Sequence, residues 1–168
     1  MKTLKLNYVK QQPIKKPGFT IIEVVLVLAI AGLIFLMVFI ALPALQRNQR
    51  DTQRKNDLSR VQSAINNFQA NNRRRVPTAA EIVATGATGF TDKYMKAGGD
   101  SFTDPSGTAY SFTAETALTT NPHATNFHAI SYYTNAKCNG EARVAGGGAN
   151  KVAVAITLEG GGVYCLNN

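Results

Sequence analysis

The sequence has no tryptophan, two cysteines and two histidines among its 168 residues, and only 17% of its residues are charged. It contains no P-loop string, no zinc-protease helix motif and no serine-nucleophile elbow. We therefore expect no catalysis and no cofactor. With 45% apolar residues the chain is neither disordered nor collagen-like, and it has room for one modest domain plus attachments.

The net charge of +8 is unevenly distributed along the chain. Five lysines and no acidic residue lie in the first 18 residues, so the remainder carries 13 basic residues against 10 acidic ones. A general polyanion-binding surface therefore has little compositional support. A basic segment of this kind is expected to stay on the cytoplasmic side of a membrane.

Residues 24–45 form an apolar run without a charged side chain. As a helix with about 1.5 Å rise per residue the run spans roughly 33 Å, which matches a bilayer core of about 30 Å. A buried core helix is one alternative, although such helices are usually shorter and keep a polar stripe. A secretory signal peptide cleaved near Ala41 or Ala44 is another, but its apolar part would be shorter.

A specific motif, KKPGFTIIE at residues 15–23, precedes the apolar run. Pro17 disfavours helix in the residue before it, and Gly18 tolerates extended or left-handed backbone, so a protease could receive this segment as an open strand. From Phe19 onward no proline interrupts the first turns, and helix can begin at once.

This motif with its long apolar run resembles the prepilin leader and cleavage site of type IV pilins and of the pseudopilins of secretion and competence systems. The resemblance implies that a membrane prepilin peptidase cuts after Gly18 and methylates the new amino group of Phe19. It also implies an α+β pilin fold, with one long helix over about residues 19–72 packed on a small antiparallel sheet. A membrane platform protein, a cytoplasmic ATPase and minor pilins would assist assembly.

Glu23 is a lone carboxylate at the start of the apolar run. A charge within a membrane helix costs about 2.5 to 3.5 kcal/mol at the helix centre, so it is usually functional or close to the interface. It could simply reach the lipid headgroups. The resemblance implies that it pairs with the amino terminus of Phe19 on a neighbouring subunit, which fixes the axial register of a helical filament.

Two residues weaken the predicted helix. Pro43 is expected to kink or locally melt it, and Gly32 is a second weak point. Pilins often carry the proline a few residues nearer the cleavage site, so the position of a melted segment stays open.

Residues 46–57 are nearly all polar and are expected to form a solvated helix. Arg47 and Lys55 each stand four residues from Asp51, a spacing that favours ion pairs.

An apolar stripe with helical spacing follows, and it should pack against a globular head. The stripe consists of Leu58, Val61, Ile65 and Phe68. It is too short for a coiled coil. The helix should end between Asn71 and Arg75, before Pro77. The basic residues 73–75 could bind DNA, but cations at a helix C-terminus are also favoured by the helix dipole.

Residues 76–168 are expected to form a small head rich in turns. A short helix is expected over 78–84, with Thr78 as N-cap, Glu81 completing a capping box and Gly86 ending the helix. The best strand candidates are residues 109–113, 127–133, 151–158 and 163–166, the last two joined as a hairpin around glycines 160–162.

Cys138 and Cys165 both fall in the head. In an oxidising space outside the membrane two cysteines most simply form one disulfide, and many pilins tie their C-terminal region in this way. Free thiols or a metal site are less favoured, because no four-ligand cluster accompanies the cysteines.

The segment from Asp100 to Tyr110 looks like an Asp-Pro-x-Gly turn that precedes a strand in major pseudopilins. Pro105 presets φ and Gly107 supplies flexibility. Asp100 and Asp104 are weak candidates for calcium ligands. His123 and His128 are expected to be solvated surface residues.

These features divide the chain into four segments: a leader over 1–18 that is removed, a membrane and filament-core helix over 19–45, a soluble helix over 46–75, and a head over 76–168. We expect a single-pass inner-membrane precursor with its N-terminus inside, followed by an extracellular pilus filament. Adhesion to a host or cell surface, twitching motility or DNA uptake would be its role. A pseudopilin and an uncleaved single-pass membrane receptor are the alternatives.

Overall fold

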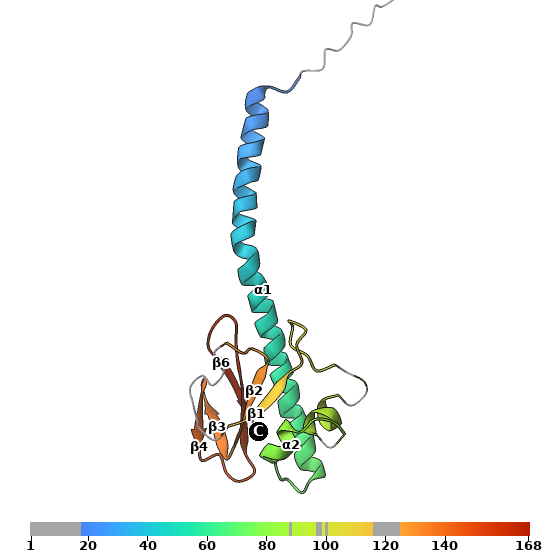
Figure 1. Ribbon diagram of the computed structural model, residues 1–168. Helices are drawn as coiled ribbons and strands as arrows, with labels where there is room; N and C mark the ends of the chain where they lie inside the picture. The colour runs from blue at the N-terminus through green and yellow to red at the C-terminus, as the bar shows by residue number, and fades with distance from the viewer. Residues whose placement is uncertain (1–17, 88, 97–98, 100, 116–124) are drawn as a thin grey trace, which may run out of the picture. The chain divides into compact units, whose positions relative to one another are not determined.

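A computed structural model describes residues 18–168 except 88, 97–98, 100 and 116–124. The chain divides into two units, residues 1–41 and residues 42–168. The first described element, helix α1 (Ile21–Asn71), contributes its first half to one unit and its second half to the other (Figure 1). The predicted leader lies almost wholly outside the described residues.

Helix α1 is continuous through Gly32 and Pro43. The predicted local melting at Pro43 is therefore wrong for this structure. A proline removes one backbone donor, and the neighbouring hydrogen bonds of a long helix are enough to keep the segment helical. A kink at either residue stays a prediction. The helix ends at Asn71, inside the predicted interval.

The second half of α1 packs on a small sheet, as the apolar stripe predicts. All four stripe residues are buried, with exposed fractions between 0% and 5%. The sheet has the strand order β1-β2-β5-β6, and β1 (Ser111–Ala114), β2 (Ala129–Thr134), β5 (Val152–Thr157) and β6 (Val163–Asn167) are its strands. Each overlaps one of the four predicted strands.

The sheet is not wholly antiparallel. β5 pairs antiparallel with β2 and β6, but β1 runs parallel to β2. The prediction of an antiparallel sheet is therefore wrong at this edge. Strand signals are the same in either direction, and only the connection between the two strands decides which one forms. The predicted β5–β6 hairpin is confirmed, and Leu158 and Gly162 close its loop with a backbone hydrogen bond of 3.1 Å.

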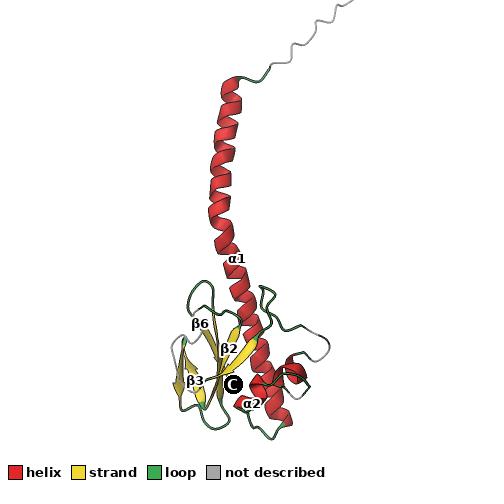
Figure 2. Ribbon diagram, viewed as in Figure 1, coloured by secondary structure: helices red, strands yellow, loops and turns green. Residues whose placement is uncertain are grey.

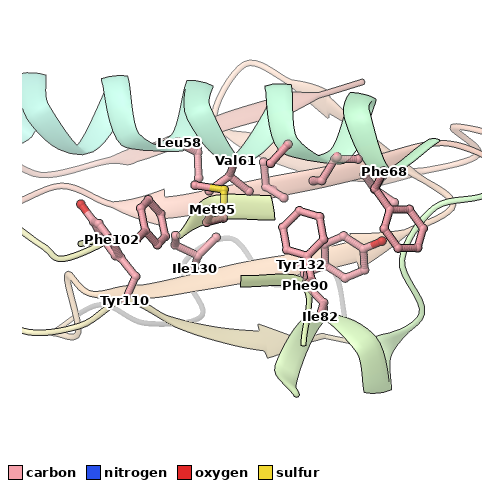
Figure 3. Close-up of a cluster of buried hydrophobic side chains, with 14 of the residues drawn as sticks. Leu58, Val61, Phe68, Ile82, Phe90, Met95, Phe102, Tyr110, Ile130 and Tyr132 are labelled. Carbon is pink, nitrogen blue, oxygen red and sulfur yellow. The ribbon is translucent and has the colours of Figure 1, made fainter. Parts of the chain in front are cut away.

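The core lies between α1, the facing side of the sheet and the connecting segments (Figure 3). Ile130 and Tyr132 of β2 alternate with residues that point to the other face, as the period of two in a strand requires. Phe68 meets the rings of Phe90 and Tyr94 at centroid distances of 6.2 and 5.4 Å. The architecture is α+β, a long N-terminal helix on a small sheet, and it is consistent with the pilin fold.

A two-stranded sheet consists of β3 (Ala136–Asn139) and β4 (Ala142–Ala145) (Figure 2). It adjoins the face of the main sheet that points away from α1. The sequence analysis did not predict these strands. Cys138 of β3 and Cys165 of β6 form the predicted disulfide, which ties the two sheets together.

Helix α2 (Ala79–Val83) begins with the predicted capping box of Thr78 and Glu81. Gly86, predicted to stop it, has a left-handed φ of 84° two residues beyond the extended C-cap Ala84. A π-helical turn, η1 (Thr91–Met95), was not predicted.

Candidate functional site

The large apolar side chains in the first half of α1 are all exposed. The large apolar side chains between Phe19 and Leu45 have exposed fractions from 44% to 89%. The helix is long and apolar enough to span a membrane. Exposed apolar surface of this extent marks a region that is buried against a membrane or another protein.

The predicted cleavage junction lies just before α1. Gly18, Phe19 and Thr20 have no regular secondary structure, and Phe19 is 89% exposed. Gly18 does not have a left-handed φ, and a Cβ at this position would meet nothing within 4 Å. No contact in the described part of the chain therefore requires a glycine here.

Thr20 and Glu23 form a capping box at the start of α1. The Thr20 backbone N–H donates to Glu23 Oε2 at 2.9 Å, and the Thr20 hydroxyl donates to the same oxygen at 2.8 Å. The Glu23 N–H reaches back to Thr20 Oγ1 at 3.4 Å. This capping role was not predicted, although the Thr-x-x-Glu signature before an apolar run indicates it.

Helix α2 begins with the same box but completes it with a cation. The Thr78 N–H donates to Glu81 Oε2 at 2.8 Å, and Arg75 donates to both carboxylate oxygens at 2.7 Å. These bonds, led by the one from Arg75, lower the pKa of Glu81 to about 2. Among the residues that the structure describes, no cation approaches Glu23, and its Oε1 receives no hydrogen bond. Glu23 is thus a capped carboxylate with one oxygen still available.

A second polar cluster lies where the head meets α1. Arg54 is 1% exposed and binds three carboxylates: its Nε donates to Asp104 at 2.6 Å, and its terminal nitrogens reach Asp51 and Glu159 at 3.1 and 2.8 Å. Arg50 adds a bond of 2.6 Å to Glu159. We call Arg50, Asp51, Arg54, Asp104 and Glu159 the charged cluster. It joins α1 to the β5–β6 loop and to the turn at Asp104.

The charged cluster corrects the prediction that residues 46–57 are a solvated helix. Asp51, Arg54 and Asp57 lie on the buried face. Asp51 pairs with Arg54 rather than with Arg47 or Lys55, and its carboxylate also accepts the backbone N–H groups of Glu159 and Gly160 at 2.8 Å. Polar composition alone did not predict burial, because the partners from the head lie 50 or more positions away in the sequence.

The pKa shifts in this region follow from burial and from these partners. Burial raises the pKa of Asp104, but the hydrogen bonds from Arg54 and Ser106 outweigh burial and leave it below its ordinary value. The hydrogen bonds from Arg50, with those from Arg54, lower the pKa of Glu159. Burial raises the pKa of Asp57, against an opposing hydrogen bond of 3.0 Å from the Tyr110 hydroxyl.

The Asp-Pro-x-Gly turn is confirmed as a turn. Gly107 donates to the carbonyl of Asp104 at 2.8 Å and has a φ of 88°, and Thr103 bridges Ala109. The side chain of Asp104 is fully engaged by Arg54 and by the N–H of Ser106 at 2.9 Å. Asp104 is therefore an ion-pair partner of Arg54 in this structure, and its role as a calcium ligand stays a prediction. Asp100, the other candidate, lies outside the described residues, as does His123.

The three arginines after α1 have separate roles. Arg75 pairs with Glu81 and lies 4.7 Å above the ring of Phe68. Arg73 and Arg74 are exposed, with φ of 51° and 65°, in the left-handed region that glycine usually occupies.

Comparison with known proteins found no matching family model, no similar curated protein and no similar solved structure.

Proposed function

We propose that this chain is a pilin-like subunit. It is made as a membrane precursor, cleaved between Gly18 and Phe19, and assembled into a filament whose core is the apolar half of α1. The proposal rests chiefly on Glu23, a capped carboxylate with one oxygen that no described residue binds, beside a segment whose large apolar side chains are all exposed.

The internal comparison with α2 supports a role for a cation supplied by another copy. Glu81 has the same capping box and takes its cation from Arg75. After cleavage, Phe19 of a neighbouring subunit would present a positive amino group at the corresponding place. An ion pair in a low-dielectric bundle costs free energy when it is misaligned, so it sets register more than it adds stability.

Gly18 supports the processing step. No contact among the residues that the structure describes requires glycine there, whereas a peptidase that binds the junction as an extended strand would require a small residue. The junction is also exposed and outside regular structure, which a protease needs.

The first experiment is mass spectrometry of the mature protein from cells that contain a prepilin peptidase. We expect loss of residues 1–18 and one methyl group on Phe19. A product that retains Met1 would instead support an uncleaved membrane receptor. Gly18→Val should block cleavage, whereas Gly32→Val lies away from the junction, at a helical glycine whose added side chain meets nothing within 4 Å, and serves as a control.

The second experiment measures filament yield. Glu23→Gln keeps the shape and part of the cap but removes the charge, and we expect normal insertion and cleavage with at least about tenfold fewer filaments. Glu81→Gln is the matched control in the second capping box and should assemble. Normal yield from Glu23→Gln would contradict the proposed register contact.

A pseudopilin is the second candidate, favoured by the Asp-Pro-x-Gly turn that leads into β1. Electron microscopy of sheared cell surfaces separates the two. Long surface fibres containing this chain favour a pilus, and their absence when secretion is intact favours a pseudopilus.

A further inference from the structure

The C-terminal end of α1 holds two consecutive arginines in the left-handed region of the backbone. The N–H of Arg74 donates to the carbonyl of Gln69 at 2.8 Å, a six-to-one bond that closes the helix in the Schellman manner. This closure places the residue before Arg74 in the left-handed region, a position that usually holds glycine and sometimes asparagine. Here that residue is Arg73, with φ of 51°, and Arg74 after it is left-handed as well, with φ of 65°. Strain of this kind points to a function for the side chains.

A cavity of about 350 Å³ lies beside Arg74. It is lined by Asn66, Gln69, Arg74, Asn150, Lys151 and Asn168. Its polar residues are two cations and four amides, without a carboxylate side chain or an aromatic ring among them. The volume suits a single sugar-sized unit rather than a large apolar ligand.

Part of this lining is already fixed by internal hydrogen bonds. Gln69 donates to the carbonyl of Asn150 at 2.9 Å and accepts from the Asn168 amide at 2.8 Å. Lys151 donates to a main-chain oxygen of Asn168 at 2.8 Å, which leaves it further donor capacity. Within the described chain, the guanidinium of Arg74 and the side-chain amides of Asn66 and Asn150 have no hydrogen-bond partner. A preformed wall therefore presents unused donors and acceptors.

We propose that this cavity binds an acidic polysaccharide through a uronic acid unit. Arg74 and Lys151 hold the carboxylate, which a guanidinium can bind with two parallel hydrogen bonds. The free amides of Asn66 and Asn150 each offer a donor and an acceptor to neighbouring hydroxyl groups. Single-stranded nucleic acid fits less well, because it relies on aromatic residues for base stacking and none lines the cavity. This inference goes beyond the proposed filament role and does not depend on it.

The test uses dispersed mature protein in detergent micelles, so its result is independent of filament formation. Binding is measured by calorimetry with oligogalacturonate, with its methyl ester as the neutral match, and with single-stranded DNA of equal charge. We expect oligogalacturonate to bind at least about tenfold more tightly than either of the other two. Equal binding of the ester, or tighter binding of the DNA, would overturn the proposal.

Variants separate the cavity from general positive charge. Arg74→Gln and Lys151→Gln should each weaken oligogalacturonate binding at least about tenfold, whereas Lys137→Gln, an exposed cation on β3, should change it less than about twofold. Arg74→Gly should raise the thermal midpoint by relieving the left-handed strain, yet lose binding. Wild-type affinity in Arg74→Gly would contradict the proposed site. If binding is lost, a raised thermal midpoint of the same variant would show that the loss does not come from unfolding.

Discussion

The two halves of α1 differ in which side chains they bury: the first half exposes large apolar side chains, whereas the second half buries three charged ones. In the first half, apolar side chains such as Ile21 and Phe39 are 86% and 72% exposed. In the second half, Arg54 is 1% exposed, and Asp51 and Asp57 are 7% exposed. The buried charges of the second half have partners on the same helix and in the head. The apolar side chains of the first half are exposed in the described chain, and surface of this kind is long and apolar enough to be covered by a bilayer or by another protein.

The largest expected effect comes from breaking the charged cluster. Arg54→Met leaves Asp104 buried without its cation, and removal of one partner of a buried ion pair typically costs about 3 to 5 kcal/mol. Urea unfolding of the head is the measurement. Arg47→Met, which removes an exposed cation from the same helix, should change the free energy of unfolding by less than about 0.5 kcal/mol.

A double variant sharpens this result. Arg54→Met with Asp104→Leu replaces the most buried pair by apolar groups and should recover much of the loss, since such exchanges are often close to neutral. The remaining carboxylates keep other partners: Glu159 retains Arg50, and Asp51 retains two backbone N–H groups. No recovery in the double variant would mean that the cluster acts through geometry rather than through charge balance.

The disulfide comes next in size. Replacing Cys138 and Cys165 by alanine opens a loop with a sequence separation of 27 residues, which the loop-entropy model values at about 3 to 4 kcal/mol. The same urea experiment detects the loss. Reduction of the wild-type protein should give a similar shift, and a much smaller one would show that packing of β3 and β4 holds them without the bond.

Acid should weaken the head through the charged cluster. The pKa values of Asp104 and Glu159 are lowered on folding, so the folded state binds fewer protons than the unfolded state near their ordinary values of 3.8 and 4.5. Their stabilisation is present above those values and is lost as the pH falls through the lowered ones. Asp57, with a raised pKa, acts in the opposite direction, because it takes up its proton earlier in the folded state.

Urea unfolding at pH 7, 4 and 3 checks the sign, and we expect stability to decline over this range. Asp57→Asn removes the opposing contribution and should make the decline steeper. Stability that is constant or rises on acidification would mean that the lowered pKa values do not control the head.

Features that depend on neighbouring residues were predicted from the sequence, and contacts between distant residues were not. The stripe from Leu58 to Phe68, the four sheet strands, the capping box at Thr78 and the disulfide were predicted, because local periodicity, local motifs and cysteine count are all visible in the sequence. The burial of Arg54 was not predicted, because its partners Asp104 and Glu159 lie 50 and 105 residues away. The parallel direction of the β1–β2 pair was not predicted, because strand signals are the same in either direction. The box at Thr20 was not predicted, although the Thr-x-x-Glu spacing is a local signal.

The smallest expected effect concerns that cap. Thr20→Val removes the hydroxyl that links both partners of the box, and loss of an N-cap costs about 0.5 to 2 kcal/mol of helix stability. The loss should be confined to the first turn of α1, because the charged cluster and the core hold the second half independently. Hydrogen exchange should therefore speed up in the first turn while the urea midpoint of the head stays the same. Thr52→Val, whose hydroxyl donates to the carbonyl of Asn48 inside the helix, is the control and should leave the first turn unchanged. A shift of the head midpoint in Thr20→Val would show that the two halves of α1 are coupled, and the contrast between them would then be one of composition but not of stability.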